Sequence, residues 1–270
     1  MRIVSLCPSN TEIAAYLGLT NQLVGVDDYS DWPGEVKNLP KVGPDLSIDM
    51  DKVEALQPDV ILASLSVPGM EKNIEKLKAR SLPYIVSSPN SLDDVRRDLL
   101  HIGDACGQYK KAQTVVSRMD HIVSDYKQKA ANCKPIRVYW EWWPKPAYSP
   151  GGANWLTTIS RLAGAQNVLE NRSEASCQVT WEEIKQLNPD HICLAWVGIL
   201  TEKVKPELLY KREGWPSMTA LRERNIHVLE ESLYCRPSPR LIIGLQKLAY
   251  RLHPDVFPNP NNKDPLFIEH

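Results

Sequence analysis

Residues Val179–Ala195 read VTWEEIKQLNPDHICLA, and the chain carries a second version of this stretch at Ile48–Ala63, IDMDKVEALQPDVILA. When the two copies are aligned on their Pro-Asp pairs, Asp51 falls on Glu182 and the apolar positions coincide. Each copy predicts a short helix, a turn at Pro-Asp and a buried strand, because the residue before a proline is disfavoured in the α conformation and an apolar run follows. A repeat placed once in each half predicts two lobes of similar build.

Helix starts are marked at several points of the chain. Asp49 is suited to be the N-cap of the helix in the first copy, and Thr180 with Glu183 forms a capping box in the second. Ser9 with Glu12 predicts another capping box, directly after the strand-like Arg2–Leu6. Strand and helix therefore alternate from the start.

The pattern divides the chain into four parts. Residues 1–90 and 134–253 alternate strands and helices, as lobes with mainly parallel sheets do. Residues 91–133 repeat apolar side chains at helical spacing and predict a stiff helical connector, whereas residues 254–270 predict an irregular tail. Ser238-Pro239 predicts the start of the last helix. The expected fold class is α/β, with two Rossmann-like lobes joined by a single long backbone helix and a ligand cleft between the lobes.

Composition excludes several classes of protein. The 270 residues carry a formal net charge of −1 with 24% charged residues, which does not favour binding to nucleic acid. No apolar run reaches about 18 residues, so membrane insertion is not expected. The six cysteines form no C-x-x-C pair and are expected to be free thiols in a monomer. No signal peptide precedes the first strand, so we expect a cytoplasmic protein, or an extracytoplasmic or periplasmic one if an export signal has been removed.

The residues that follow the predicted strands are the candidates for ligand binding, because open α/β sheets bind ligands beyond the carboxyl ends of their strands. Many of them are aromatic and suit a large, flat, partly apolar ligand. Trp142 and Trp143 alternate across a strand, so at least one of them is expected in the core. The ligand-binding candidates are Ser9, Asn10, Tyr29, Trp32, Ser64, Glu141, Trp142, Trp143, Trp196, Tyr234 and Arg236.

Metal binding and catalysis find little support. None of the six histidines follows a strand on the proposed ligand side and no His cluster is present, so no metal site and no cofactor of its own are expected. No G-x-S-x-G, G-x-G-x-x-G or phosphate-loop motif occurs. Two polar features each allow two roles. The Gly151-Gly152 pair forms a tight turn or holds an anion, and Glu141 with Arg236 could form an acid–base or substrate-clamping pair.

Asp51 and Glu182 are equivalent acids in the first turn of equivalent helices. Either they complement the helix dipole, or they mark the docking site of a partner with two matching basic sites. The repeat alone does not decide between these roles.

Several segments together resemble substrate-binding proteins of ABC importers, and more narrowly the cobalamin-binding subgroup of the class that also takes haem and ferric siderophores. They are RIVSLCPSNTEIAAYLG (2–18), GVDDYSDWP (25–33), the L-x-PD-V-I-L-A copy, RVYWEWWPKPAYSPG (137–151) and YCRPSPRLIIGLQKLAYRL (234–252). The resemblance implies binding of cobalamin or a related corrinoid without catalysis, and an ABC permease dimer as partner.

The resemblance also implies roles for single residues. Tyr29, Trp32 and Trp142 match corrinoid contacts of the family, and Asp51 and Glu182 match its transporter-docking acids.

Departures from the family pattern concern the ligand. Relatives carry a cleft tryptophan where this chain has Ser64, a second one where Pro44-Asp45 stand, and an acid at Cys235. A haem or ferric-siderophore binding protein is therefore one alternative. An intracellular corrinoid-handling protein or enzyme that reuses the cleft, with Glu141 and Arg236 as working groups, is another.

Overall fold

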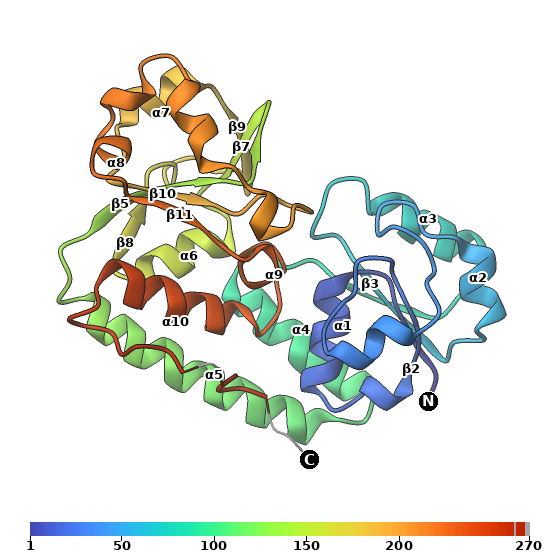
Figure 1. Ribbon diagram of the computed structural model, residues 1–270. Helices are drawn as coiled ribbons and strands as arrows, with labels where there is room; N and C mark the ends of the chain where they lie inside the picture. The colour runs from blue at the N-terminus through green and yellow to red at the C-terminus, as the bar shows by residue number, and fades with distance from the viewer. Residues whose placement is uncertain (262, 268–270) are drawn as a thin grey trace. The chain divides into compact units, whose positions relative to one another are not determined.

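The computed structural model describes residues 1–261 and 263–267, which form two compact units (Figure 1). Unit 1 contains Met1–Asp120, Pro237–Pro239 and the residues from Pro265 on. Unit 2 contains His121–Arg236 and Arg240–Asp264. Within the described residues, no helix is both long enough and apolar enough to cross a membrane.

Each unit is built on a four-stranded parallel sheet. Unit 1 has the order β2-β1-β3-β4, from β1 (Ile3–Ser5), β2 (Leu23–Val26), β3 (Val60–Ser64) and β4 (Tyr84–Ser87). Unit 2 has the order β11-β10-β5-β8, from β5 (Ile136–Glu141), β8 (Ala165–Asn167), β10 (His191–Leu194) and β11 (Ile226–Val228). When the sequence copies are aligned, β1, β2, β3 and β4 correspond to β5, β8, β10 and β11. The order is then the same in both units, so the predicted two-lobed α/β fold class is confirmed.

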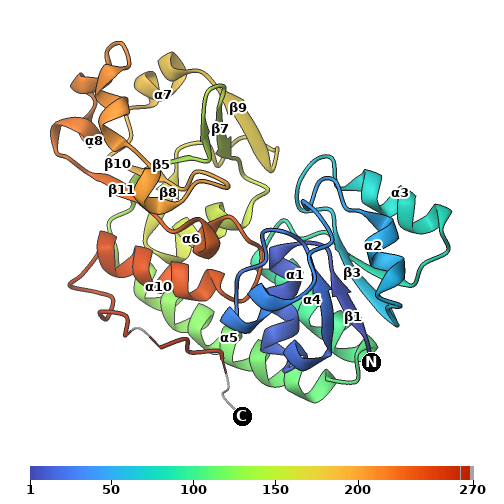
Figure 2. The same cartoon turned by 45° about the vertical axis from the view of Figure 1, so that its right-hand side comes forward.

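Helices lie on both faces of each sheet (Figure 2). Those of unit 1 are α1 (Pro8–Tyr16), η1 (Thr20–Gln22), η2 (Gly34–Asn38), α2 (Met50–Ala55), α3 (Glu71–Ala79), α4 (Leu92–Ala105) and the first part of α5 (Tyr109–Ala130). Those of unit 2 are the rest of α5, α6 (Trp155–Leu162), α7 (Trp181–Leu187), η3 (Thr201–Lys203), η4 (Pro206–Lys211), η5 (Trp215–Ser217), α8 (Thr219–Arg222), α9 (Glu231–Tyr234) and α10 (Leu241–Leu252).

Alternate residues of each strand supply the two faces of the core. In unit 1, Val4 and Ile61 point to the face covered by α2 and α3, where they join Val53 and Leu77. In unit 2, Ile192 and the residues of α7 and α8 form the equivalent cluster. Full burial of one such aliphatic side chain contributes about 1.5–3 kcal/mol, so these layers hold each sheet between its helices.

The helical segment begins as predicted. Ser91 caps α4 by accepting a hydrogen bond from the Asp94 amide at 3.2 Å, and Gly107 takes the positive φ of +70° that ends it. The division between the two units falls inside α5, after Asp120. The reason is that α4 buries Val95 and its other apolar residues within unit 1.

Two helix starts differ from the prediction. Helix α1 begins at Pro8 with Cys7 as its N-cap, so Ser9 does not cap it. The carboxylate of Glu12 instead accepts a hydrogen bond from the hydroxyl of Ser238. Helix α10 accordingly starts later than predicted, at Leu241. Glu12 and Ser238 therefore bond to each other, 226 positions apart in the sequence, and neither takes part in a local cap.

The caps in the repeated segment are confirmed in part. Asp49 accepts from the Asp51 amide at 3.1 Å, and the hydroxyl of Thr180 accepts from the Glu183 amide at 3.1 Å. The Glu183 carboxylate pairs with Arg172, so only half of the predicted capping box is present.

A small antiparallel sheet in unit 2 was not predicted. Strand β5 ends at Glu141, and the chain then forms β6 (Trp143–Pro144), β7 (Ala147–Pro150) and β9 (Ser176–Val179), in the order β6-β7-β9. The single strand expected to carry both Trp142 and Trp143 is therefore split at Trp142. The split moves Trp143 out of the parallel sheet and onto a hairpin.

Candidate functional site

The first turn of α1 lies at the carboxyl ends of β1 and β3. Asn10 is 1% exposed, and its amide Nδ2 donates to the carbonyl oxygen of Ala63 at 2.9 Å. This bond ties the turn after β1 to the end of β3. Ser9 is also buried, with its hydroxyl 3.3 Å from the sulfur of Cys7. Ser64, at the end of β3, donates its hydroxyl to that of Ser66 at 3.0 Å.

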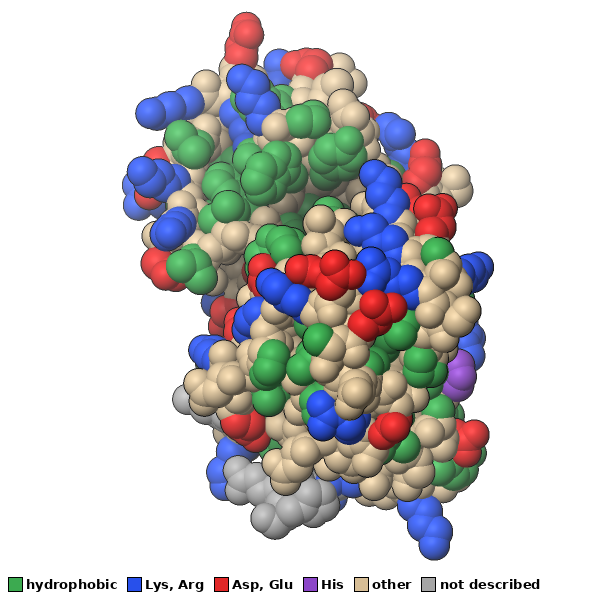
Figure 3. Space-filling model, turned by 90° about the vertical axis from the view of Figure 1, so that its right-hand side faces the viewer, with side chains coloured by type: hydrophobic (Ala, Val, Ile, Leu, Met, Phe, Trp, Pro, Cys, Tyr) green, Lys and Arg blue, Asp and Glu red, His purple; other side chains and the backbone are tan. Residues whose placement is uncertain are grey.

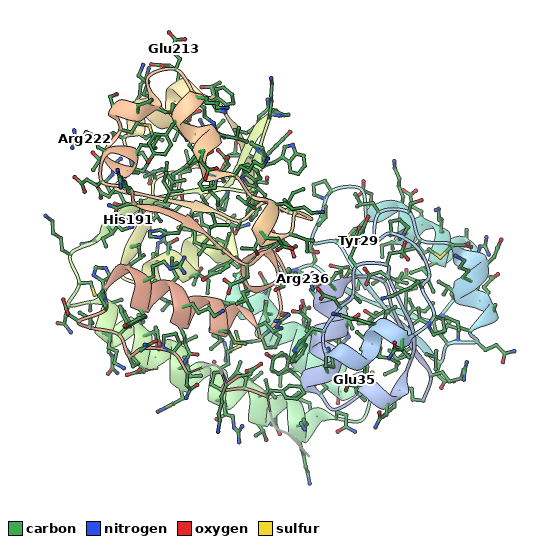
Figure 4. The ribbon with its side chains drawn as sticks, in the orientation of Figure 1. Tyr29, Glu35, His191, Glu213, Arg222 and Arg236 are labelled. Atoms are coloured by element: carbon green, nitrogen blue, oxygen red, sulfur yellow. The ribbon has the colours of Figure 1, made fainter. Side chains whose placement is uncertain are left out.

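A buried polar network supports the loop that carries Tyr29. The carboxylate of Asp27 accepts from the hydroxyl of Ser30 and, at 2.8 Å, from the Tyr29 amide. The hydroxyl of Ser30 is 2.7 Å from that of Thr11 in α1. Burial raises the pKa of Asp27 to about 6. The network leaves the Tyr29 side chain 54% exposed (Figure 4).

Trp32 lies in an aromatic cluster of unit 1. Its ring centroid is 5.3 Å from that of Tyr16 and 5.1 Å from that of Phe267. Such tilted and edge-on contacts contribute about 0.5–1.5 kcal/mol each beyond the area they bury. The ring is therefore held by its own unit, and a ligand contact for Trp32 stays a prediction.

Glu141 forms a buried ion pair with Arg212 in unit 2. The guanidinium donates two hydrogen bonds to the carboxylate, at 2.6 and 2.8 Å, and the side chains are 0% and 4% exposed. Trp196 donates its indole N–H and Tyr139 its hydroxyl to the same carboxylate, each at 3.2 Å. The Arg212 guanidinium also lies over the ring of Trp215, 4.3 Å from its centroid. The carboxylate thus accepts four hydrogen bonds, which offset the cost of burying its charge.

The pairing of Glu141 with Arg236 is therefore wrong. Arg236 donates instead to Glu231 at 3.2 Å, within unit 2 (Figure 4). Arg212 was missed because it stands 71 positions from Glu141, directly after the short 3₁₀ helix η4, and no sequence pattern links the two.

The neighbouring tryptophans Trp142 and Trp143 have different surroundings. Trp142 is partly buried, with its ring centroid 5.9 Å from that of Trp155. Trp143 is 41% exposed and stands opposite Tyr148 on the β6–β7 hairpin. Trp142 is thus the more buried of the pair. The tryptophan of β5 that is fully buried is Trp140.

Trp196 and Tyr234 lie inside unit 2. Trp196 is 7% exposed, and Tyr234 is fully buried with its hydroxyl donating to the carbonyl of Gly244 at 2.9 Å. Direct contact of these two side chains with a ligand stays a prediction.

Exposed apolar side chains gather in the loops after the strands. In unit 1 they are Tyr29 after β2, and Leu65 and Val67 after β3. In unit 2 they are Trp143 after β5, and Val197 and Leu200 after β10. Figure 3 shows hydrophobic side chains gathered on one face of unit 2, in the upper part of that view. Contiguous exposed apolar surface typically marks a binding surface. The single aliphatic residues were missed because one apolar residue in a loop has no periodicity to reveal it.

The Gly151-Gly152 pair forms a tightly packed turn. A Cβ added to Gly151 would lie 2.2 Å from the carbonyl oxygen of Glu174, and one added to Gly152 would lie 2.4 Å from that of Glu170. Glycine is required by this close approach of backbone. The surrounding carbonyl oxygens would repel an anion, so the anion-binding alternative is wrong.

Asp51 and Glu182 occupy equivalent, exposed positions. Each is in the first turn of its helix, α2 or α7, and the side chains are 84% and 59% exposed. Asp51 pairs with Arg80 at 2.6 Å and Glu182 with Lys185 at 3.1 Å. Surface pairs of this kind contribute little to stability. The large exposed fractions of the two carboxylates leave both acids accessible to a partner.

Within the described part of the chain, no group of three His, Cys, Asp or Glu side chains could hold a metal ion. Two histidines of unit 2 contact each other, with Nδ1 of His191 2.8 Å from Nε2 of His227. Burial, with the neighbouring His191, lowers the pKa of His227 to about 4. Burial also lowers the pKa of His191.

The histidine pair predicts loss of stability in acid. The unfolded-state pKa of a histidine is about 6.5, so the unfolded chain takes up the proton first as the pH falls. The contribution of His227 is fully present above about pH 6.5, and about 3 kcal/mol of it is lost as the pH falls to about 4. We expect the urea midpoint of wild type to fall between pH 7 and pH 4.5 by more than that of His227→Gln. Equal falls would contradict the prediction.

Comparison with known proteins identifies the family. Residues 3–233 match the family described as periplasmic binding protein. An uncharacterized ABC transporter substrate-binding lipoprotein of Bacillus subtilis is 33% identical over 262 residues, which cover 95% of this chain and 81% of that protein. A vitamin B12-binding protein of Pectobacterium atrosepticum is 26% identical over 258 residues, 93% of this chain and 88% of that one.

A solved structure agrees at the level of the fold. A periplasmic haem-binding protein from Pseudomonas aeruginosa aligns with a TM-score of 0.81 and 22% identity, over 98% of this chain and 96% of that one. The chain therefore belongs to the periplasmic binding protein family, whose members are substrate-binding proteins and not enzymes.

Proposed function

We propose that this protein binds cobalamin or a related corrinoid and delivers it unchanged to an ABC importer, as an extracytoplasmic monomer. The relatives support the transport role, since one is an ABC substrate-binding lipoprotein and another is a vitamin B12-binding protein. The observation that carries the choice of a large ligand is the exposed apolar surface after the strands of each unit.

The exposed aromatic side chains of that surface suit a wide ring system. Trp143 and Tyr148 stand side by side across the β6–β7 hairpin, and Val197 follows β10 close by, with its amide donating to the carbonyl of Trp142 at 3.1 Å. In unit 1, Tyr29 follows β2, and Leu65 follows β3, the counterpart of β10. Aromatic side chains present large contact areas with little side-chain entropy to lose. A corrin ring offers broad faces that such side chains can cover.

Titration with cyanocobalamin tests the proposal. The protein contains eight tryptophans, and we expect saturable quenching of their fluorescence together with heat in a calorimeter. If titration produces neither quenching nor heat, the corrinoid assignment is overturned. Haemin and a ferric siderophore serve as competitors, because the structural likeness to a haem-binding protein shows the fold alone. Tight binding of either competitor, with no response to cyanocobalamin, would move the assignment to that alternative.

Trp143→Ala should weaken cyanocobalamin binding by about tenfold to a hundredfold. Covering an exposed indole by a ligand is worth about 1.5–3 kcal/mol, and each 1.4 kcal/mol changes the affinity tenfold. Tyr109→Ala is the matched control, because Tyr109 is 45% exposed but starts α5, away from the loops after the strands. If the two variants bind equally well, Trp143 does not contact the ligand.

A further inference from the structure

A buried side chain holds the turn at the end of β2 in unit 1 and at the end of β8, its counterpart, in unit 2. Asp27 directly follows β2, and its Oδ2 accepts from the amide of Tyr29, two residues further on, at 2.8 Å. Asn167 ends β8, and its Oδ1 accepts from the amide of Leu169, also two residues further on, at 3.1 Å. Both Asp27 and Asn167 are 0% exposed. We call these two arrangements the Asp27 brace and the Asn167 brace.

Each brace is tied to a helix through a threonine. In unit 2, Nδ2 of Asn167 donates to the hydroxyl of Thr157 in α6 at 2.8 Å. In unit 1, the hydroxyl of Ser30 donates to the Asp27 carboxylate and lies 2.7 Å from the hydroxyl of Thr11 in α1. A carboxamide can accept on one side and donate on the other. The Asn167 brace therefore shows that an uncharged side chain is sufficient to hold such a turn.

The two braces present residues with opposite surroundings. Leu169 is 3% exposed and belongs to the core of unit 2, whereas Tyr29 is 54% exposed (Figure 4). Unit 1 also adds a second support. Nζ of Lys41 donates to the carbonyl oxygens of Asp27 at 3.1 Å and of Ser30 at 2.9 Å. The main chain is thus held on both sides of Tyr29, and the exposed ring stands on a loop that is fixed from inside its own unit.

The charge of Asp27 is buried at a cost. Burial, together with the charge of Asp45, raises the pKa of Asp27 to about 6, although the hydrogen bonds from Ser30 and Tyr29 and the nearby Lys41 act to lower it. A buried charge is weak evidence for a role in stability. Perturbed groups of this kind cluster at functional sites. The Asp27 brace therefore points to a function of the loop that it holds.

We infer, on the basis of the proposed function, that Asp27 is a positioning residue for ligand binding, which fixes the loop so that the Tyr29 ring is in place before the ligand arrives. Asp27 is fully buried, so it acts through Tyr29 and not by contact with the ligand. A loop that is already ordered loses little freedom on binding, so more of the contact energy appears as affinity. The Asn167 brace presents a core residue and has a structural role alone.

A double-mutant cycle with cyanocobalamin tests the inference. Tyr29→Ala should weaken binding about tenfold, since it removes an exposed ring. Asp27→Ala should weaken binding by about three- to tenfold in wild type, but by less than about twofold in Tyr29→Ala, because it acts through that ring. Asp59→Ala is the matched control. Its carboxylate also accepts from a main-chain amide, that of Arg2 at 2.7 Å, but at the amino end of β3. Equal weakening by Asp27→Ala in both backgrounds would overturn the inference.

The conservative variant separates positioning from charge. Asp27→Asn should bind cyanocobalamin like wild type, because a carboxamide can accept from the Tyr29 amide and donate to Ser30, as Asn167 accepts and donates in unit 2. The Ser30 hydroxyl is then free to donate to Thr11. If Asp27→Asn binds as weakly as Asp27→Ala, the hydrogen bonds of Asp27 do not position Tyr29.

Hydrogen exchange of the ligand-free protein provides a measurement that does not depend on affinity. The Tyr29 amide should be protected in wild type and in Asp27→Asn, and should exchange rapidly in Asp27→Ala. The Leu6 amide, which donates to Leu62 at 2.9 Å in the core of unit 1, reports folding and should stay protected in all three. Equal protection of Tyr29 in wild type and Asp27→Ala would overturn the inference and leave the corrinoid function standing. Wild type that binds no cyanocobalamin would overturn the proposed function and the inference that rests on it.

Discussion

Arg212→Met should lower the free energy of unfolding of unit 2 by about 3–5 kcal/mol, the cost of leaving a buried charge without its partner. In wild type the Glu141 carboxylate receives two hydrogen bonds from Arg212 and is fully buried. Removing the guanidinium leaves that carboxylate with neutral donors only, from Trp196 and Tyr139. Methionine keeps much of the volume, so the loss reports the charge rather than a cavity.

Urea unfolding followed by tryptophan fluorescence measures the change. Arg222→Met is the matched control, because its side chain is 62% exposed and lies in the same unit (Figure 4). The double variant Glu141→Gln with Arg212→Met should recover part of the loss, since it removes the unpaired charge as well. If Arg212→Met unfolds at the same urea concentration as Arg222→Met, the pair does not stabilise unit 2.

The second large effect concerns transport. Asp51→Ala combined with Glu182→Ala should abolish uptake of the ligand through its permease and leave ligand affinity in solution unchanged. Each acid presents an exposed carboxylate on an equivalent helix. If each forms a desolvated ion pair with the permease, its loss costs about 2–5 kcal/mol, so two losses weaken docking by at least about a thousandfold.

Uptake of radiolabelled cyanocobalamin into proteoliposomes that hold the cognate permease measures this effect. Glu35→Ala combined with Glu213→Ala is the matched control, with one exposed acid in each unit at a non-equivalent position (Figure 4). Uptake is expected to be normal with the control. Unchanged uptake with Asp51→Ala and Glu182→Ala would show that the two acids only complement the dipoles of their helices and do not dock the permease.

Most of the fold could be predicted from the repeated segment. Its helix, its Pro-Asp turn and its apolar strand are local features, and local features leave periodic patterns. Asp49 and Thr180 could be assigned as caps because each bonds an amide two or three residues away. The equal strand order in both units then follows from two copies of one pattern.

The failures share a different cause. Ser9 and Ser238 have the composition of N-caps, but neither caps a helix, because Ser238 donates to Glu12 across most of the chain. Glu141 was expected near Arg236 and instead pairs with Arg212. In each case several partners were chemically suitable. Only the packed structure decided which of them came within hydrogen-bond distance.

By itself, the sequence determined that this protein is a duplicated α/β chain with aromatic loops after its strands and one acid at the start of each repeated helix. Short-range forces suffice for that, since helix periodicity, proline and capping act over a few residues. The tertiary structure alone decided that Trp143 is exposed, that Glu141 is neutralised by Arg212, and that Asn10 and Trp142 keep unpartnered polar atoms. These features depend on contacts between distant residues, where burial, rather than residue type, determines which polar groups find a partner.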